Sequence, residues 1–177
     1  KMEDTADTIR NRVDESGLTT IDLDDLIARK PIVSFDLAEC LENGLILREK
    51  PFRQTLKNLK PEDWTEKIVV LHCSNDAIVP EWAWMLATSQ LTAHGASVGI
   101  GRAEDVKQAL LIEAIQQLPQ ESFRDARIVI KGCSSGTNAE SLAAAIRHLQ
   151  PVALSIFYGE PCSTVPVYKR PKNPAKN

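Results

Sequence analysis

Three cysteines each stand where a hydrophobic run of this chain gives way to polar or turn-forming residues: Cys73, Cys133 and Cys162. In a parallel α/β sheet the carboxyl ends of the strands meet at one edge, where ligands usually bind. Three thiols at that edge are soft ligands of the kind that hold zinc or an iron–sulfur cluster. The sequence therefore predicts a three-cysteine site, with zinc and an iron–sulfur cluster both left open as the cofactor.

Polar neighbours of these cysteines extend the candidate site. His72 adjoins Cys73, so in a regular strand the two side chains point to opposite faces, and His72 becomes a metal ligand only where the strand has begun to turn. Asp76 lies in the loop that follows and is a candidate general base or orienting partner of a ligand. Lys131, close to Cys133, is a cation of the kind that lowers a thiol pKa. The candidate catalytic residues are therefore Cys73, Asp76 and Cys133.

Three familiar catalytic motifs are incomplete in this chain. A cysteine-dependent phosphatase uses an arginine six residues after its nucleophile to bind phosphate, whereas Val79 stands six residues after Cys73. Residues 132–136 fit the G-x-S-x-G pattern of α/β-hydrolases, but the acid at Asp76 precedes the serine and breaks the order of that triad. Residues 73–76 are similar to a strand end of β-type carbonic anhydrases, whose second zinc-binding half, His-x-x-Cys, is missing.

Two further features concern the segment after Lys131 and the fourth cysteine. The turn leading into the next helix is a candidate anion site, because helix N-termini attract anions; its residues are Ser134, Ser135, Gly136 and Thr137. Thr137 with Glu140 also matches the S/T-x-x-E capping box. Cys40 stands beside Leu37 and Leu41 and is expected to be an inert, buried thiol.

The elements that position these residues alternate regularly from residue 67 onward. Strands are predicted at 67–73, 97–101, 127–132 and 152–158. Helices are predicted between them, beginning at Pro80, at Glu104 and at Thr137. Right-handed crossovers fold such a chain into a parallel sheet between two layers of helices. The predicted fold class is α/β, a Rossmann-like three-layer αβα sandwich with a mainly parallel sheet of four or more strands.

The first third of the chain is less regular. Extended segments are predicted at 18–23 and 31–35, helices at 9–13 and 52–59, and no internal sequence repeat is evident. We therefore expect one domain over residues 1–177. Its parts are an irregular elaboration packed on the sheet at 1–63, an α/β core at 64–168 and a basic tail at 169–177.

Composition limits the classes of function. The chain has 177 residues, of which 43% are hydrophobic and 25% charged, and a formal net charge of −3. These values are ordinary for a globular protein and give no electrostatic case for binding nucleic acid. No apolar run approaches the ~20 residues of a membrane helix and no signal-peptide core is evident, so we expect no membrane span and a cytoplasmic location. Four cysteines in that setting favour thiols or metal ligands over disulfides.

Four segments carry a resemblance that covers nearly the whole chain: residues 44–50, 71–80, 131–133 and 158–169. Together they resemble a family of small bacterial proteins of unknown function, DUF family 2480. The family pattern includes the positions of Cys73, Cys133 and Cys162 but not that of Cys40, so the resemblance favours the three-cysteine set. It also implies a link to iron–sulfur cluster assembly.

We therefore expect an accessory protein of iron–sulfur cluster assembly, with assembly proteins as its partners and a homo-oligomer left open. Its site would be Cys73, Cys133 and Cys162, with His72 as a further ligand. Two alternatives stay open at this point. One is a thiol-dependent or zinc-dependent enzyme acting on a small substrate, and the other is a non-catalytic interaction module with buried cysteines.

Overall fold

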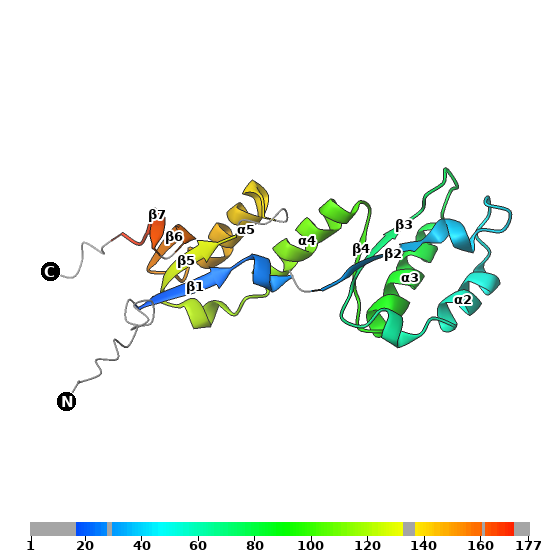
Figure 1. Ribbon diagram of the computed structural model, residues 1–177, viewed down its shortest axis with the longest axis horizontal. Coiled ribbons are helices and arrows are strands. Elements are labelled where there is room, and N and C mark those ends of the chain that lie inside the picture. The colour runs from blue at the N-terminus through cyan, green and yellow to red at the C-terminus, as the bar shows by residue number, and fades with distance from the viewer. Residues whose placement is uncertain (1–16, 28–29, 133–136, 161, 172–177) are drawn as a thin grey trace, which may run out of the picture.

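The strands of the protein form two separate sheets. The computed structural model describes residues 17–27, 30–132, 137–160 and 162–171. Figure 1 shows an elongated molecule with the four-stranded sheet and α5 (Ala139–Leu149) in one half, and the three-stranded sheet with α2 (Glu49–Lys57) and α3 (Glu81–Ala93) in the other. Helix α4 (Ala103–Gln116) lies between the two halves.

The four-stranded sheet joins the beginning of the described chain to its end. Its strands, in spatial order, are β1 (Leu18–Asp22), β5 (Arg127–Lys131), β6 (Ser155–Glu160) and β7 (Ser163–Lys169). The pairs β1–β5 and β5–β6 are parallel, whereas β7 returns antiparallel to β6.

The three-stranded sheet is wholly parallel and has the spatial order β2 (Ile32–Asp36), β3 (Ile68–His72) and β4 (Ser97–Ile100). Its central strand is buried on both faces, which explains the unbroken apolar run at 68–71. The first third of the chain thus contributes β1 to one sheet and β2 to the other.

Short 3₁₀ turns connect several of these elements. They are η1 (Asp24–Leu26), η2 (Leu37–Cys40), η3 (Pro61–Asp63) and η4 (Gln120–Phe123). Of the predicted helices, those at 52–59, after Pro80, and from Glu104 correspond to α2, α3 and α4. The helix predicted at 9–13 lies outside the described residues.

The start of α5 differs from the prediction. Asn138, not Thr137, is the N-cap: its Oδ1 accepts hydrogen bonds from the backbone N–H groups of Glu140 and Ser141, and the Ser141 hydroxyl accepts one from the N–H of Asn138. The Thr137 hydroxyl instead donates to Oδ1 of Asp24, 3.0 Å away. The capping box is therefore present but shifted by one residue, because Thr137 is used to tie the helix start to the turn after β1.

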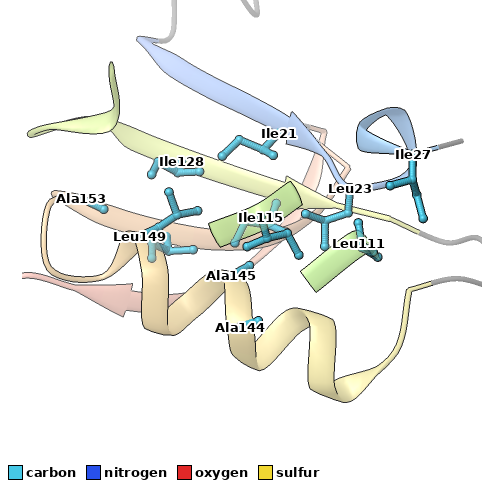
Figure 2. Packing of buried hydrophobic residues seen from close by; sticks show 12 residues of the cluster. Ile21, Leu23, Ile27, Leu111, Ile115, Ile128, Ala144, Ala145, Leu149 and Ala153 are labelled. Carbon is cyan, nitrogen blue, oxygen red and sulfur yellow. The ribbon is translucent and has the colours of Figure 1, made fainter. Parts of the chain in front are cut away.

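Each sheet has its own hydrophobic core. In the first, Ile21, Ile128 and Ile156 of the four-stranded sheet pack against α5 and the second half of α4, as Figure 2 shows in part. In the second, Phe35, Val69 and Leu71 pack against α2 and α3. The contact face of α3 is built from Ala83, Ala87 and Leu91, and the small side chains of the two alanines let the helix approach the sheet closely.

Helix α4 packs against both sheets. Val106, in its first turns, covers Ile68 and Val70 on the face of the three-stranded sheet opposite α3, while Leu111 and Ile115 lie in the core of the other sheet. Helices therefore cover both faces of the three-stranded sheet, and the α/β class with mainly parallel strands in a layered sandwich is confirmed. A single domain over 1–177 stays a prediction.

The two halves repeat one architecture. In each, an N-terminal edge strand ends at an aspartate, Asp22 or Asp36, and a leucine follows as the chain enters the 3₁₀ turn η1 or η2. Each edge strand pairs in parallel with a central strand, which is followed by a helix and a third parallel strand.

No helix in the described ranges has the length and apolarity to cross a membrane.

Candidate functional site

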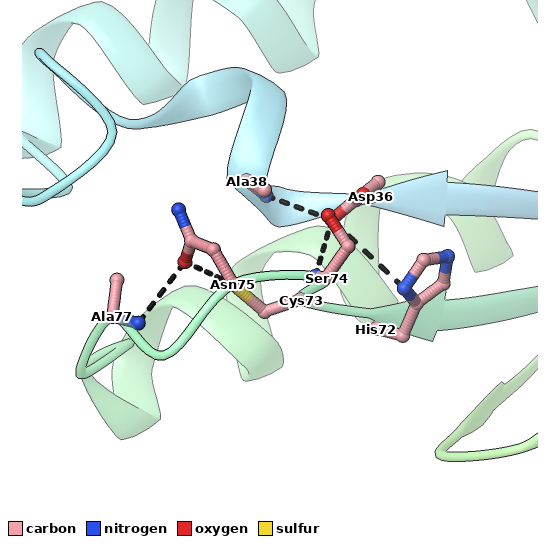
Figure 3. Close-up of polar contacts among 7 residues, drawn as sticks. All are labelled: Asp36, Ala38, His72, Cys73, Ser74, Asn75 and Ala77. Atoms are coloured by element: carbon pink, nitrogen blue, oxygen red, sulfur yellow. Dashed lines mark hydrogen bonds and ion pairs between the residues drawn. The ribbon is translucent and has the colours of Figure 1, made fainter.

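A hydrogen-bonded network joins the carboxyl ends of β2 and β3 (Figure 3). Its centre is Asp36, the last residue of β2, whose Oδ1 accepts from the backbone N–H groups of Ala38 at 2.9 Å and Ser74 at 3.0 Å. The first bond caps η2 and the second holds the loop after β3. A single carboxylate thus fixes the relative position of two chain segments far apart in the sequence.

The charge of Asp36 is stabilised by this network. Partial burial by itself would raise the pKa of the carboxyl, but the hydrogen bonds from Ser74 and Ala38, and the nearby His72, outweigh it and leave the pKa lower than usual. Nδ1 of His72 lies 3.9 Å from Oδ1 of Asp36, within ion-pair range when the imidazole is protonated.

Cys73 directly follows β3 and lies on the face of the sheet opposite His72. Its thiol donates to Oδ1 of Asn75 at 3.3 Å, and this amide is itself fixed, because Oδ1 also accepts from the N–H of Ala77 and Nδ2 donates to the carbonyl of Gly44. Cys73 packs on the core beneath α3, whereas His72 lines a groove on the opposite face of the sheet. His72 and Cys73 therefore point to opposite faces, as predicted. The hydrogen-bond partner of the Cys73 thiol is a neutral amide, which is not a base.

Asp76 lies in the exposed loop between β3 and α3, as predicted. Within the described ranges, no hydrogen bond or ion pair joins it to Cys73. The role of Asp76 as a general base stays a prediction.

A second polar cluster occupies the carboxyl edge of the four-stranded sheet. Nζ of Lys131 lies 3.1 Å from Oδ2 of Asp22 and 3.8 Å from Oε2 of Glu160, so the last residues of three neighbouring strands meet there. The hydrogen bond to Asp22, followed by the charge of Glu160, raises the pKa of Lys131. The ammonium is therefore a fixed positive charge at this edge.

The hydroxyl of Tyr158 donates to the carbonyl of Gly132 at 3.3 Å and links the end of β5 to β6. A Cβ at Gly132 would lie 2.8 Å from Oγ1 of Thr137, so a larger residue at the strand end would displace the Thr137 side chain. Cys162 is exposed in the connection between β6 and β7. Cys133, Ser134, Ser135 and Gly136 lie outside the described residues, so the predicted anion turn is described only at Thr137.

The structure separates the predicted cysteine ligands. The expectation of one shared edge assumed one continuous sheet, but β3 belongs to the three-stranded sheet and β5 and β6 to the other. Figure 1 shows β3 and the β6–β7 hairpin in different halves of the molecule. Cys73 and Cys162 therefore do not meet, and among the residues that the structure describes no three His, Cys, Asp or Glu side chains are grouped as metal ligands.

Cys40 fits its expected role. It lies half-buried in η2 and packs against the core of the three-stranded sheet. Burial, followed by the charges of Glu39 and Asp36, raises the pKa of this thiol and keeps it protonated.

Sequence reasoning missed the aspartates that organise both edges. Asp22 is opposite Lys131 in the β1–β5 pairing, and Asp36 is opposite His72 in the β2–β3 pairing. The available signal was an aspartate followed by leucine at the end of each of the first two strands. Such an aspartate is typical of a residue that caps the turn after the strand.

Comparison with known proteins yields a family but no characterised relative. No match was found among curated proteins, and none among solved structures. Residues 7–170, nearly the whole chain, match the family described as "Protein of unknown function (DUF2480)". The chain belongs to this family.

Proposed function

We propose that the protein binds a thiophilic metal ion or an iron–sulfur cluster through Cys133 and Cys162, as an accessory in iron–sulfur cluster assembly. The observation that carries this proposal is the pairing of β5 with β6, which are parallel neighbours with Ile130 opposite Tyr158. Chain segments that follow two such strands leave the sheet at the same edge. Cys133 directly follows Gly132, and Cys162 stands two residues after Glu160.

The charges at this edge suit a bound metal cation. Asp22 and Glu160 outnumber the Lys131 ammonium that they hold, so the excess charge is negative. Cysteine binds metal as the thiolate. Zinc and iron–sulfur clusters prefer four protein or solvent ligands, so two thiolates leave positions for a partner, a second copy of the chain or a small molecule. Open coordination positions would allow the bound metal or cluster to be passed to a partner.

The proposal retains two of the three cysteines predicted from the sequence. Cys73 lies on the other sheet with its thiol bonded to Asn75. His72 lies on that sheet too, so neither residue is assigned to this site.

The test is the metal and sulfide content of protein purified without oxygen and without a metal-affinity tag, before and after reconstitution. We expect Cys133→Ser and Cys162→Ser each to lose most of the bound metal. Cys73→Ser and Cys40→Ser are the matched controls and should retain it. Equal loss in Cys73→Ser, or no metal in any preparation after reconstitution, would contradict the proposal.

A second candidate, thiol-dependent catalysis on a small substrate, draws on the same edge. The exposed thiol of Cys162 and the fixed charge of Lys131 are features of reactive cysteines. Rapid alkylation of one thiol near neutral pH in metal-free protein, slowed by Lys131→Met, would favour this candidate over metal binding.

A further inference from the structure

An apolar hollow of about 280 Å³ lies between α5 and the β6–β7 hairpin. Leu142 and Ile146 form its helical wall, and Ile156, Val165 and Val167 contribute from the sheet. Every residue that lines it is apolar or aromatic. The hollow is open because β7 is the outermost strand, and Val165 and Val167 are 63% and 52% exposed.

Exposed valines on the open face of a sheet carry a cost, because their apolar surface remains in water. Pairing of a further strand along β7 would not cover them, since side chains on a face lie away from the hydrogen-bonding edge. Pro166, in the middle of β7, also lacks the N–H that a full ladder needs. The occupant that fits is therefore an apolar group lying on the face, between the strand and the helix.

A second hollow, of about 380 Å³, lies beside the first and is basic. Arg147 and the C-cap residue Gln150 line it from the end of α5, and Tyr168 and Arg170 line it from the end of β7 and the residue that follows. Gln150 stands one helical turn after Ile146, on the same side of the helix. Val165 and Tyr168 pair with Tyr158 and Ile156, which are two residues apart on β6, so both lie on one face of the sheet and the two hollows adjoin.

The charges in the basic hollow do not cancel. Arg170 is anchored by the carbonyl of Val152, at 2.5 Å, and by an ion pair with Asp125. Arg147 is exposed, and no hydrogen bond or ion pair joins it to another residue within the described part of the chain. Two guanidinium groups thus face one carboxylate, and the excess is positive.

We propose that these adjacent hollows form a binding site for a free medium-chain carboxylate, with its tail against α5 and β7 and its head group at Arg147 and Arg170. Guanidinium groups bind carboxylates through paired hydrogen bonds. At roughly 30 Å³ per heavy atom, the volume of one water molecule in the liquid, the apolar hollow has room for about nine carbons. This site is distinct from the proposed cysteine site and does not depend on it.

The test is isothermal titration calorimetry of the full chain with sodium decanoate, kept below its critical micelle concentration. We expect saturable binding of one decanoate per chain, with acetate and decanol each binding at least about tenfold more weakly. Acetate lacks the tail and decanol lacks the charge, so each removes one half of the proposed recognition.

Variants separate the two halves of the site. Arg147→Glu should weaken decanoate about tenfold and leave decanol unchanged, whereas Arg102→Glu, at the start of α4, is the matched control and should have no effect. Leu142→Trp should block the tail. Val165→Asp, at an exposed position that tolerates a charge without unfolding, should do the same.

Three results would overturn the proposal. They are the absence of saturable decanoate binding, equal weakening by Arg102→Glu and Arg147→Glu, and binding only to vesicles of anionic lipid with no response to the free acid.

Discussion

At the scale of single residues, the last position of each edge strand organises the candidate sites. Asp22 and Asp36 each accept a hydrogen bond from the N–H two residues further on, at 3.0 Å and 2.9 Å. Each also faces the cationic or ionisable residue at the end of the neighbouring strand, Lys131 or His72. The same device therefore fixes both carboxyl edges.

Replacing Asp36 tests this device. We expect Asp36→Ala to lower the free energy of unfolding by about 1–3 kcal/mol at neutral pH, because the N–H groups of Ala38 and Ser74 lose a charged acceptor. Asp36→Asn keeps an acceptor oxygen and should cost less. Urea unfolding of the three proteins measures both differences.

The stability contributed by the Asp36 charge should depend on pH. The pKa of the Asp36 carboxyl in the folded protein lies below that of an ordinary aspartate, so the charge stabilises the fold at neutral pH and its contribution is lost as the pH falls through the folded pKa. The difference in the free energy of unfolding between wild type and Asp36→Asn should therefore narrow on acidification. A difference that widens on acidification would contradict this assignment.

Several residue placements were predictable and others were not. The opposite orientation of His72 and Cys73 follows from strand geometry alone. The partners of Asp22 and Asp36 do not, because they depend on which strands pair. Asp22 meets Lys131 across more than one hundred residues of sequence, and no local pattern encodes that register.

At the scale of elements, α4 holds the two halves together. Val106 packs on the three-stranded sheet, and Leu111 and Ile115 pack in the other core. The contact with β4 is very close: a Cβ at Gly99 would lie 2.5 Å from Cγ1 of Val106. Glycine at this position is therefore required by packing rather than by an unusual backbone conformation.

Gly99→Ala should lower the free energy of unfolding by about 1–3 kcal/mol, because the added methyl group must displace the stiff, buried side chain of Val106. The same substitution in a Val106→Ala background should cost much less, since the opposing methyl groups are gone. A double-mutant cycle by chemical denaturation measures the coupling. Equal costs in the two backgrounds would show that the close contact is not the cause.

At the scale of the whole molecule, the alternating strands and helices after residue 67 were predictable from hydrophobic runs, but their division between two sheets was not. The runs at 68–71 and 128–130 have the same buried character, and nothing in either one indicates which sheet it joins. The chain passes from one sheet to the other twice, between β1 and β2 and again between β4 and β5, the second time along α4, which packs against both sheets. Long-range pairing decides this division, and periodicity reports only local structure.

The division into two halves changes the candidate site. One continuous sheet would gather three cysteines at one edge, whereas two sheets of similar design give each half its own edge. Cys73 belongs to the edge organised by Asp36, and Cys162 to the edge organised by Asp22 and Lys131. We therefore expect Cys133 and Cys162 to act together and Cys73 not to act with them.

The most direct test is alkylation of each cysteine, followed by mass spectrometry, in metal-loaded protein before and after a chelator is added. We expect bound metal to protect Cys133 and Cys162 together, the chelator to make both reactive, and the alkylation rate at Cys73 to stay unchanged. Protection of Cys73 along with the other two, or rates at Cys133 and Cys162 that do not respond to the chelator, would contradict this expectation.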